Sequence, residues 1–255
     1  MEKPTFLTCE KPLLVCMVQA RTPERIRELA SRAIPEGAEA FGMQFCKMEP
    51  EYKNEKTYRE LFDYVKPFPT YVTNYRRGLN EGRTDDALAD ELLTLAECGA
   101  TLCDVMGDIY APCEGELTME REAIAKQERL IDALHERGAE VLMSSHVLKF
   151  TPAERVLEIA LEHQRRGADI CKIVTGAKTM EEQIENLRIT NLLKKTLDIP
   201  FLFLAGGESH IARRMGACFG NCMSLCVYEH DELSTAAQPL LRDMRILREL
   251  FDDKK

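Results

Sequence analysis

Lys172 is the residue whose type and position could most directly carry chemistry. It lies within "ICKIVT" (170–175), a short apolar run with the composition of a buried β-strand. Alternation along a strand puts Ile170, Lys172 and Val174 on one face, where apolar neighbours would desolvate the ammonium group. Desolvation lowers the pKa of a lysine, and a neutral amine attacks ketones and aldehydes to form a Schiff base. The position of Lys172 therefore indicates an imine-forming amine.

His146 is the second residue of this kind. It ends the run "EVLMSS" (140–145), which is the apolar run before that of Lys172. An imine-forming lysine needs a neighbouring group that moves protons, and histidine titrates in the useful pH range. We therefore expect His146 to act as general acid and base if the fold brings the two runs together.

The elements that must position these residues follow a repeated pattern in which short apolar runs alternate with segments of helical spacing. The apolar runs lack the clean alternation of half-solvated strands, which is typical of parallel strands covered on both faces. They comprise 13–19, 40–46, 70–75, 101–106, 140–145, 170–175, 201–205 and 222–228. The helical segments comprise 22–34, 51–66, 85–99, 116–138, 151–167, 178–197, 209–220 and 232–251.

This alternation predicts an α/β fold, a (β/α)8 TIM barrel that spans residues 1–255 as a single domain. A doubly wound open sheet is the alternative, but the first loop, "VQARTPER", has none of the glycines typical of its phosphate loop. In a barrel, Lys172 and His146 would come from neighbouring strands. Lys172 could also pair with a barrel carboxylate or extend to the mouth, and His146 could be a packed side chain.

Active sites of such barrels lie at the carboxyl ends of the strands. Besides His146 and Lys172, the polar residues expected there are Gln44, Tyr75, Arg76, Arg77, Asp104, Asp108, Glu208, Ser209, His210 and Arg213.

Composition excludes several classes of function. The formal net charge of −9 argues against partners such as nucleic acid or an anionic membrane surface. The ten cysteines lie mostly in apolar runs, and the N-terminal segment lacks the apolar core of a signal peptide, so we expect a reducing cytoplasm. Cys218, Cys222 and Cys226 are evenly spaced, but no histidine completes a zinc pattern, and we expect no metal.

Two stretches together resemble type I 3-dehydroquinate dehydratase of the shikimate pathway. "SSHVLKFTP" (144–152) matches the Ser-x-His-x-x-x-x-Thr-Pro stretch of that family, and "GADICK" (167–172) matches its Gly-Ala-Asp-x-x-Lys. The resemblance implies a lyase that eliminates water from a cyclic 3-oxo carboxylate such as 3-dehydroquinate, with Lys172 as the imine-forming lysine and His146 as the acid and base. It also implies a homodimer and neither metal nor organic cofactor, with a small keto acid as the partner.

Further site residues follow from the same resemblance. Arg213 matches the arginine that holds the substrate carboxylate, and Ser234 and Gln238 of "STAAQ" match the stretch that covers the site. Arg77 and Glu81 have the spacing of an Arg and a Glu after the third strand, where the Glu pairs with the histidine, although Arg76 fits nearly as well. Asp104 matches an aspartate at the end of the fourth strand.

The second strand departs from the family pattern. Where the family has Glu, Arg and Asp, this chain has Gly42, Gln44 and Cys46, and Cys16 replaces a serine of the first strand. Gln44 is retained as a candidate substrate contact. Because part of the substrate shell differs, three alternatives stay open: the same imine chemistry on a different keto acid, a class I aldolase or isomerase, and a non-catalytic barrel relative.

Overall fold

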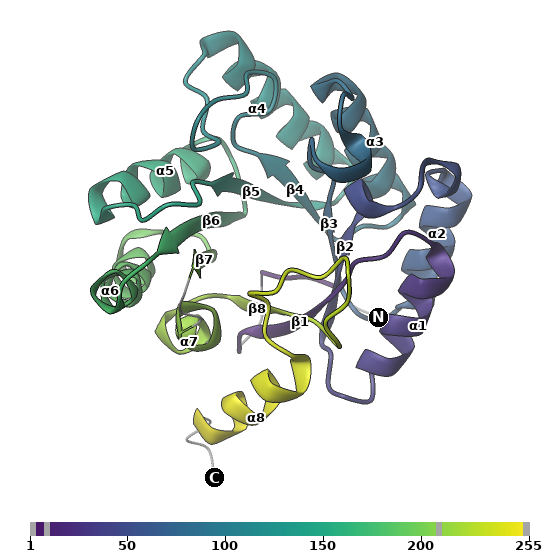
Figure 1. The fold of residues 1–255 in the computed structure, drawn as a ribbon. Coiled ribbons are helices and arrows are strands. Elements are labelled where there is room, and N and C mark those ends of the chain that lie inside the picture. The colour runs from purple at the N-terminus through teal and green to yellow at the C-terminus, as the bar shows by residue number, and fades with distance from the viewer. Residues whose placement is uncertain (1–3, 8–10, 208–210, 252–255) are drawn as a thin grey trace.

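The computed structural model describes residues 4–7, 11–207 and 211–251. Eight parallel strands form one sheet in the order β7-β6-β5-β4-β3-β2-β1-β8, and helices surround it (Figure 1). The predicted (β/α)8 barrel is thereby confirmed. The strands are β1 (Leu13–Val18), β2 (Ala40–Gln44), β3 (Thr70–Thr73), β4 (Leu102–Met106), β5 (Glu140–His146), β6 (Ile170–Ala177), β7 (Phe201–Gly207) and β8 (Met223–Cys226).

Each strand is followed by an α-helix in the described part of the chain. The helices are α1 (Pro23–Ala33), α2 (Glu55–Tyr64), α3 (Asp85–Cys98), α4 (Arg121–Glu136), α5 (Ala153–Arg165), α6 (Met180–Thr196), α7 (Ile211–Phe219) and α8 (Leu241–Phe251). Three short 3-10 helices lie in the loops after β2 and β3, namely η1 (Phe45–Lys47), η2 (Pro50–Tyr52) and η3 (Gly78–Asn80).

The segment expected from 51 becomes α-helical at Glu55, after the 3-10 helix η2, and two further helices begin later still than their sequence pattern predicts. The segment expected from 116 becomes helical only at Arg121, because Gly115 and Glu116 have positive φ angles of 84° and 50°, which a right-handed helix does not allow. The segment expected from 232 becomes helical only at Leu241. The residues before these two helices are instead loops at the carboxyl ends of β4 and β8.

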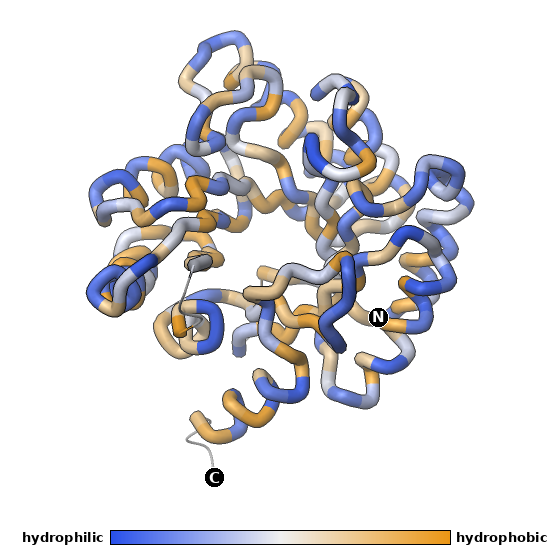
Figure 2. The backbone as a smooth tube through the Cα atoms, in the orientation of Figure 1, coloured by the Kyte–Doolittle hydropathy of each residue, from blue (hydrophilic) through white to orange (hydrophobic). Residues whose placement is uncertain are grey.

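Side chains that point into the barrel follow the period of two. The interior cluster includes Val15, Tyr71, Leu142, Ile170 and Leu202, which come from different strands and are all fully buried. A separate, larger cluster packs the outer face of the sheet against the helices. Figure 2 shows the apolar residues of the strands at the centre of the molecule and polar residues along the helices that surround it.

Asn221 links β7 and β8, which share no strand pairing within the part of the chain that the structure describes. Its buried side-chain amide accepts a hydrogen bond from the Phe203 backbone N–H at 2.9 Å and donates one to the Phe203 carbonyl at 3.0 Å. The Cys222 backbone N–H donates to the Phe201 carbonyl at 2.9 Å. A side chain therefore supplies part of the hydrogen bonding between these two strands.

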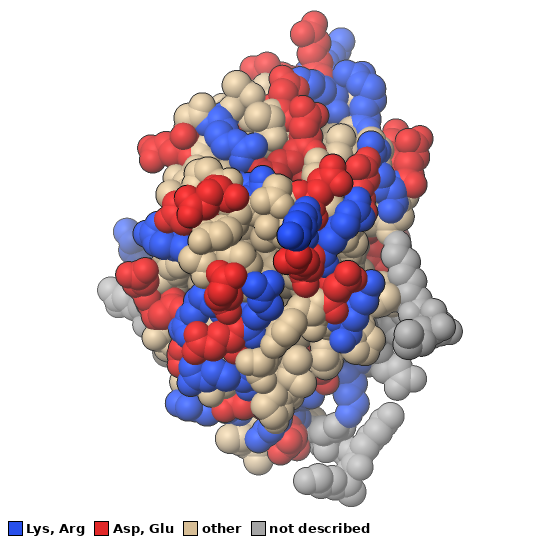
Figure 3. Space-filling model, turned by 90° about the vertical axis from the view of Figure 1, so that its right-hand side faces the viewer, with Lys and Arg blue, Asp and Glu red and all other residues tan. Residues whose placement is uncertain are grey.

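The described helices include none that is long and apolar enough to cross a membrane. Acidic and basic side chains alternate over the face of the molecule drawn in Figure 3, without a broad area of one sign.

Candidate active site

Lys172 lies on the inner face of β6 and points into the barrel. Its register partner on β5 is Ser144, and only 4% of the lysine is exposed. The Nζ atom donates hydrogen bonds to the hydroxyl of Tyr71 at 2.9 Å, the hydroxyl of Tyr75 at 2.6 Å and Oδ2 of Asp104 at 3.1 Å. Both predicted surroundings of this lysine are therefore present, namely desolvation and a barrel carboxylate.

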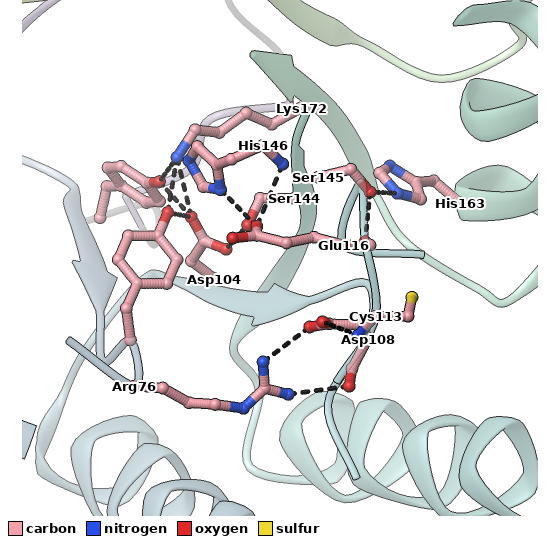
Figure 4. A network of polar contacts seen from close by, with 12 residues as sticks. Arg76, Asp104, Asp108, Cys113, Glu116, Ser144, Ser145, His146, His163 and Lys172 are labelled. Carbon is pink, nitrogen blue, oxygen red and sulfur yellow. Dashed lines mark hydrogen bonds and ion pairs between the residues drawn. The ribbon is translucent and has the colours of Figure 1, made fainter. Parts of the chain in front are cut away.

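Asp104 is the counter-ion of Lys172 (Figure 4). Tyr71 and Tyr75 donate their hydroxyl protons to Oδ2 of Asp104, and Ser144 donates to Oδ1 at 2.5 Å. Burial would raise the pKa of Asp104, but the charge of Lys172 and these hydrogen bonds outweigh burial and lower it. Asp104, which lies in the middle of β4, is therefore a carboxylate at neutral pH.

Burial dominates the titration of Lys172. It lowers the pKa of the lysine from its ordinary value, and the carboxylate of Asp104 opposes this shift only in part. A lysine with a lowered pKa gives up its proton more readily, which is a requirement of nucleophilic attack on a carbonyl group.

His146 ends β5, and its register partner is Val174, two residues beyond Lys172. Its imidazole is 8% exposed and packs edge-on against the ring of Tyr75, with ring centroids 5.2 Å apart. Because Tyr75 also contacts Nζ of Lys172, the structure brings the two predicted chemical residues together around one tyrosine.

Glu116 orients His146. Its Oε2 atom lies 2.6 Å from Nδ1 of the imidazole and accepts the His146 backbone N–H at 3.0 Å (Figure 4). A carboxylate on Nδ1 fixes the tautomer with its proton on that nitrogen, so Nε2 is left as a proton acceptor. Burial lowers the pKa of His146, and the charge of Lys172 adds to this, while Glu116 opposes it. The imidazole is therefore neutral at neutral pH and can act as a base.

The expected pairing of Glu81 with His146 is corrected by this geometry. Glu81 follows η3 and is exposed, and its place beside the imidazole is taken by Glu116 from the β4–α4 loop. The sequence pattern placed Glu116 at the start of the helical segment 116–138. The signal that was missed is Gly115, since a glycine before a charged residue can mark a loop rather than a first helical turn.

A chain of buried hydrogen bonds holds the backbone of Glu116. Ser145 Oγ donates to the Glu116 carbonyl at 2.7 Å and lies 3.0 Å from Nε2 of His163. Since the serine proton is used on the carbonyl, His163 must donate from Nε2, and its Nδ1 then accepts from the thiol of Cys171 at 3.4 Å. Burial lowers the pKa of His163 to about 3, so it is neutral and serves as a fixed donor.

Arg213 lies in α7 at the edge of a cavity of about 730 Å³. The cavity is also lined by Val174, which shares the inner face of β6 with Lys172, and by Leu148, Gly176 and Thr235. Burial lowers the pKa of Arg213 to about 10, and its Nε is buried without a hydrogen-bond partner among the described residues. A desolvated guanidinium beside a cavity is a ready site for an anion.

The two arginines after β3 have different environments. Arg76 forms ion pairs with Asp85 and, at 2.8 Å, with Asp108, and thereby ties the loop after β3 to the loop after β4 (Figure 4). Arg77 is exposed and lies over the ring of Tyr75, 4.5 Å from its centroid. Of the two arginines that fit the family spacing, Arg77 is therefore the one next to the mouth of the barrel. Arg76 and Asp108 are bound to each other and hold the two loops together.

The other predicted contacts lie around the rim. Gln44 ends β2 half-buried, and its side chain makes no capping hydrogen bond to η1. Gln238 is buried, and its Oε1 accepts from Nε2 of Gln19 at 2.8 Å. The Ser234 hydroxyl donates to the carbonyl of Asp231 at 2.9 Å, so it stabilises a turn of the β8–α8 loop. Glu208, Ser209 and His210 lie outside the described residues.

Gly42 shows how the altered second strand is packed. A Cβ atom at this position would come within 2.1 Å of Sδ of Met17, and it would also approach the Tyr71 ring. A side chain here would require the flexible Met17 side chain to move, so in this chain the thioether of Met17 fills the space beside Gly42. Cys46 is buried in η1. No group of His, Cys, Asp and Glu side chains in the described part of the chain is arranged to hold a metal ion.

The protein is thus a (β/α)8 barrel whose interior holds a buried lysine beside a His–carboxylate pair. The family model of type I 3-dehydroquinase matches residues 50–254, and the chain belongs to this family. The resemblance stated from the two sequence stretches is thus confirmed.

Named relatives and solved structures agree with this assignment. The chain is 36% identical over 97 residues to the 3-dehydroquinate dehydratase of Alkaliphilus oremlandii (37% of this chain, 38% of the relative). It is 29% identical over 126 residues to that of Listeria welshimeri (49% of this chain, 48% of the relative). These matches therefore span less than half the length of the curated relatives.

In structure, the chain resembles 3-dehydroquinate dehydratase from Geobacillus kaustophilus, with a TM-score of 0.80, 18% identity and coverage of 98% of this chain and 94% of that chain. A type I enzyme from Clostridium difficile with covalently modified comenic acid gives a TM-score of 0.78, 18% identity and coverage of 96% and 94%. At such identities the likeness establishes the fold.

Proposed function

We propose that this protein is a Schiff-base lyase that removes water from a cyclic 3-oxo carboxylate such as 3-dehydroquinate, giving 3-dehydroshikimate. The observation that carries the proposal is the buried amine of Lys172 next to the neutral imidazole of His146. Membership of the type I 3-dehydroquinase family and the names of the relatives support it.

The reaction begins at Lys172. Its amine adds to the substrate ketone, and loss of water gives an iminium ion that withdraws electrons from the adjacent carbon. The fixed carboxylate of Asp104, 3.1 Å from Nζ, remains beside this positive charge and stabilises it.

His146 then moves the proton. Nε2 removes a proton from the carbon next to the iminium carbon, which gives an enamine, and Glu116 stabilises the imidazolium through Nδ1. The enamine expels the β-hydroxyl group, to which His146 returns the proton, so water leaves. Hydrolysis of the imine releases the unsaturated ketone and restores Lys172.

Arg213 would hold the substrate carboxylate. Its guanidinium is desolvated at the cavity that also touches the inner face of β6. An arginine there can bind a carboxylate through two hydrogen bonds and so fix which carbon faces His146. We keep Arg77, Gln44, Ser234 and Gln238 as proposed rim contacts.

A second candidate is the same imine chemistry on a keto acid with fewer hydroxyl groups. Met17 fills the space at Gly42, and this favours an apolar substrate edge at the carboxyl end of β1 and β2. A turnover assay that compares 3-dehydroquinate with less hydroxylated cyclic keto acids separates the two candidates. Normal turnover of 3-dehydroquinate excludes the second one.

Borohydride trapping tests the proposed function itself. Reduction of the protein in the presence of 3-dehydroquinate should give a stable adduct on Lys172, whereas an aldolase would release a product of carbon–carbon cleavage. A non-catalytic barrel would give neither an adduct nor a product.

The oligomeric state, the location and the binding partners of the enzyme are also proposals. We propose a homodimer in the cytoplasm with a small keto acid as its partner and without binding to nucleic acid or membranes. Light scattering during size-exclusion chromatography measures the oligomeric state, and a monomer would contradict the first of these predictions.

A further inference from the structure

Tyr75 takes no part in the steps proposed above, although its hydroxyl contacts the reacting nitrogen. The hydroxyl accepts from Nζ of Lys172 at 2.6 Å and donates to Oδ2 of Asp104 at 2.5 Å. It therefore lies on a direct path for a proton between the carboxylate and the atoms bonded to Nζ.

We infer that Tyr75 is a catalytic residue that relays a proton from Asp104 to the substrate oxygen while the imine forms. This inference rests on the proposed function, because it requires that Lys172 forms an imine. The substrate class is a ketone or aldehyde whose carbonyl carbon reaches Nζ.

The proton balance of the site favours such a relay. In the free protein, Lys172 is an ammonium ion and Asp104 a carboxylate. The ammonium passes one proton to Asp104, and the neutral amine adds to the carbonyl carbon as the carbonyl oxygen takes a second proton from nitrogen. The resulting carbinolamine is neutral and carries a hydroxyl group.

Loss of that hydroxyl group requires an acid. Asp104 gives its proton to Tyr75 as Tyr75 gives its own proton to the hydroxyl oxygen, so that water leaves while the nitrogen lone pair forms the C=N bond. The products are an iminium ion and a carboxylate, which carry the same charges as the starting ion pair. Neither an external acid nor a change in net charge is needed.

Burial and the charge of Asp104 raise the pKa of Tyr75 well above its usual range. A phenol in this environment releases its proton only as it receives another one, which suits a relay between two groups. His146 can meanwhile remain neutral, with Nδ1 held by Glu116, and is then available as the base of the next step.

Tyr71 makes hydrogen bonds similar to those of Tyr75 but lies deeper in the barrel. Its hydroxyl also lies between Lys172 and Asp104, at 2.9 Å from Nζ, but it stands on β3 below Tyr75 and is completely buried. Tyr75 lies beyond the end of β3, with its ring against His146 and Arg77 at the mouth, where the substrate must enter. Tyr71→Phe is therefore the matched control for Tyr75→Phe.

The test is a rapid-quench experiment in which the wild type, Tyr75→Phe and Tyr71→Phe are mixed with 3-dehydroquinate and trapped with borohydride at increasing times. Mass spectrometry measures the fraction of Lys172 that carries the adduct. We expect the rate of adduct formation to fall about 100-fold in Tyr75→Phe, as for loss of an acid–base group, and by less than about tenfold in Tyr71→Phe. The solvent deuterium isotope effect of the wild type on this step should shrink in Tyr75→Phe.

Each result decides the question. Both variants keep the aromatic ring, and circular dichroism verifies that they are folded. Adduct formation by Tyr75→Phe at the wild-type rate, or an equal loss in the two variants, overturns the relay while leaving the proposed function in place. Absence of any adduct in the wild type overturns the proposed function and the relay with it.

Discussion

At the scale of single residues, the site contains two side-chain pairs that differ in how deeply they are buried. Lys172 and Asp104 share one buried ion pair, and His146 and Glu116 form a second pair nearer the surface. Burial lowers the pKa of both the lysine and the histidine, and each carboxylate opposes part of that shift. The base is therefore neutral when substrate arrives, and the ammonium group of Lys172 gives up its proton more readily than an exposed lysine would.

The pH dependence of kcat/KM should report His146. A protonated imidazole cannot accept a proton from carbon, so activity is lost as the pH falls through the pKa of the histidine in the folded protein. Because burial lowers that pKa from 6.5, we expect the acidic limb of the profile below pH 6.5. A limb above pH 6.5 would contradict the assignment of His146 as the base.

Glu116→Gln should move this limb. The carboxylate raises the pKa of His146, so its removal lowers that pKa further and shifts the limb to lower pH. The imidazolium also loses its partner, and we expect kcat to fall at least about tenfold. Glu81→Gln is the control, because Glu81 is exposed and does not contact the imidazole; an effect of Glu81→Gln equal to that of Glu116→Gln would restore the original prediction.

At the scale of elements, the carboxylate that orients His146 comes from the β4–α4 loop and not from a strand. Its conformation depends on the positive φ of Glu116 and on the hydrogen-bonded chain through Ser145 and His163. Arg166 adds to this support, since its buried guanidinium donates to the carbonyls of Gly107 at 3.2 Å and Thr118 at 2.6 Å. The loop is thus held by groups of β5 and α5 that lie beneath it.

His163 should make the fold sensitive to acid. Its pKa is about 3 in the folded protein and about 6.5 in the unfolded chain, so the unfolded chain binds more protons between these values. Stability therefore rises with pH across this window, by about 1.4 kcal/mol per pH unit from this residue. Chemical denaturation of His163→Gln at pH 4 and pH 7 should show a smaller difference than the wild type, and an equal difference would refute the account.

At the scale of the whole molecule, the neighbouring strands of the barrel are not all joined in the same way. Seven neighbouring pairs of strands share backbone ladders, whereas β7 and β8 are linked through Asn221. The cavity beside Arg213 borders β7 and α7, which lie on the same side of the barrel as this join (Figure 1).

Asn221→Ala should therefore destabilise the protein strongly. It leaves the buried N–H and carbonyl groups of Phe203 without their partners, at a cost of about 1–3 kcal/mol for each group. Asn54→Ala is the control, because Asn54 caps the outer helix α2 and its loss should cost about 1 kcal/mol. Equal losses in urea denaturation would show that Asn221 does not close the barrel.

The parts of this molecule that sequence could predict are those set by local periodicity. Strands buried on both faces alternate with amphipathic helices, and the period of two places Lys172 on the inner face. Glu116 could not be predicted in the same way, because its role depends on a left-handed loop residue and on buried support from Ser145 and His163. Tyr71 and Met17 were likewise missed, since their contacts cross between strands far apart in sequence.

The central claim is that Lys172 forms an imine with a cyclic keto acid. The most direct measurement is mass spectrometry of the intact protein and of its peptides after borohydride reduction with 3-dehydroquinate, for the wild type and Lys172→Ala. We expect one adduct, located on Lys172 in the wild type and absent from a folded, inactive Lys172→Ala protein. An adduct on another lysine, or turnover that persists in Lys172→Ala, would contradict it.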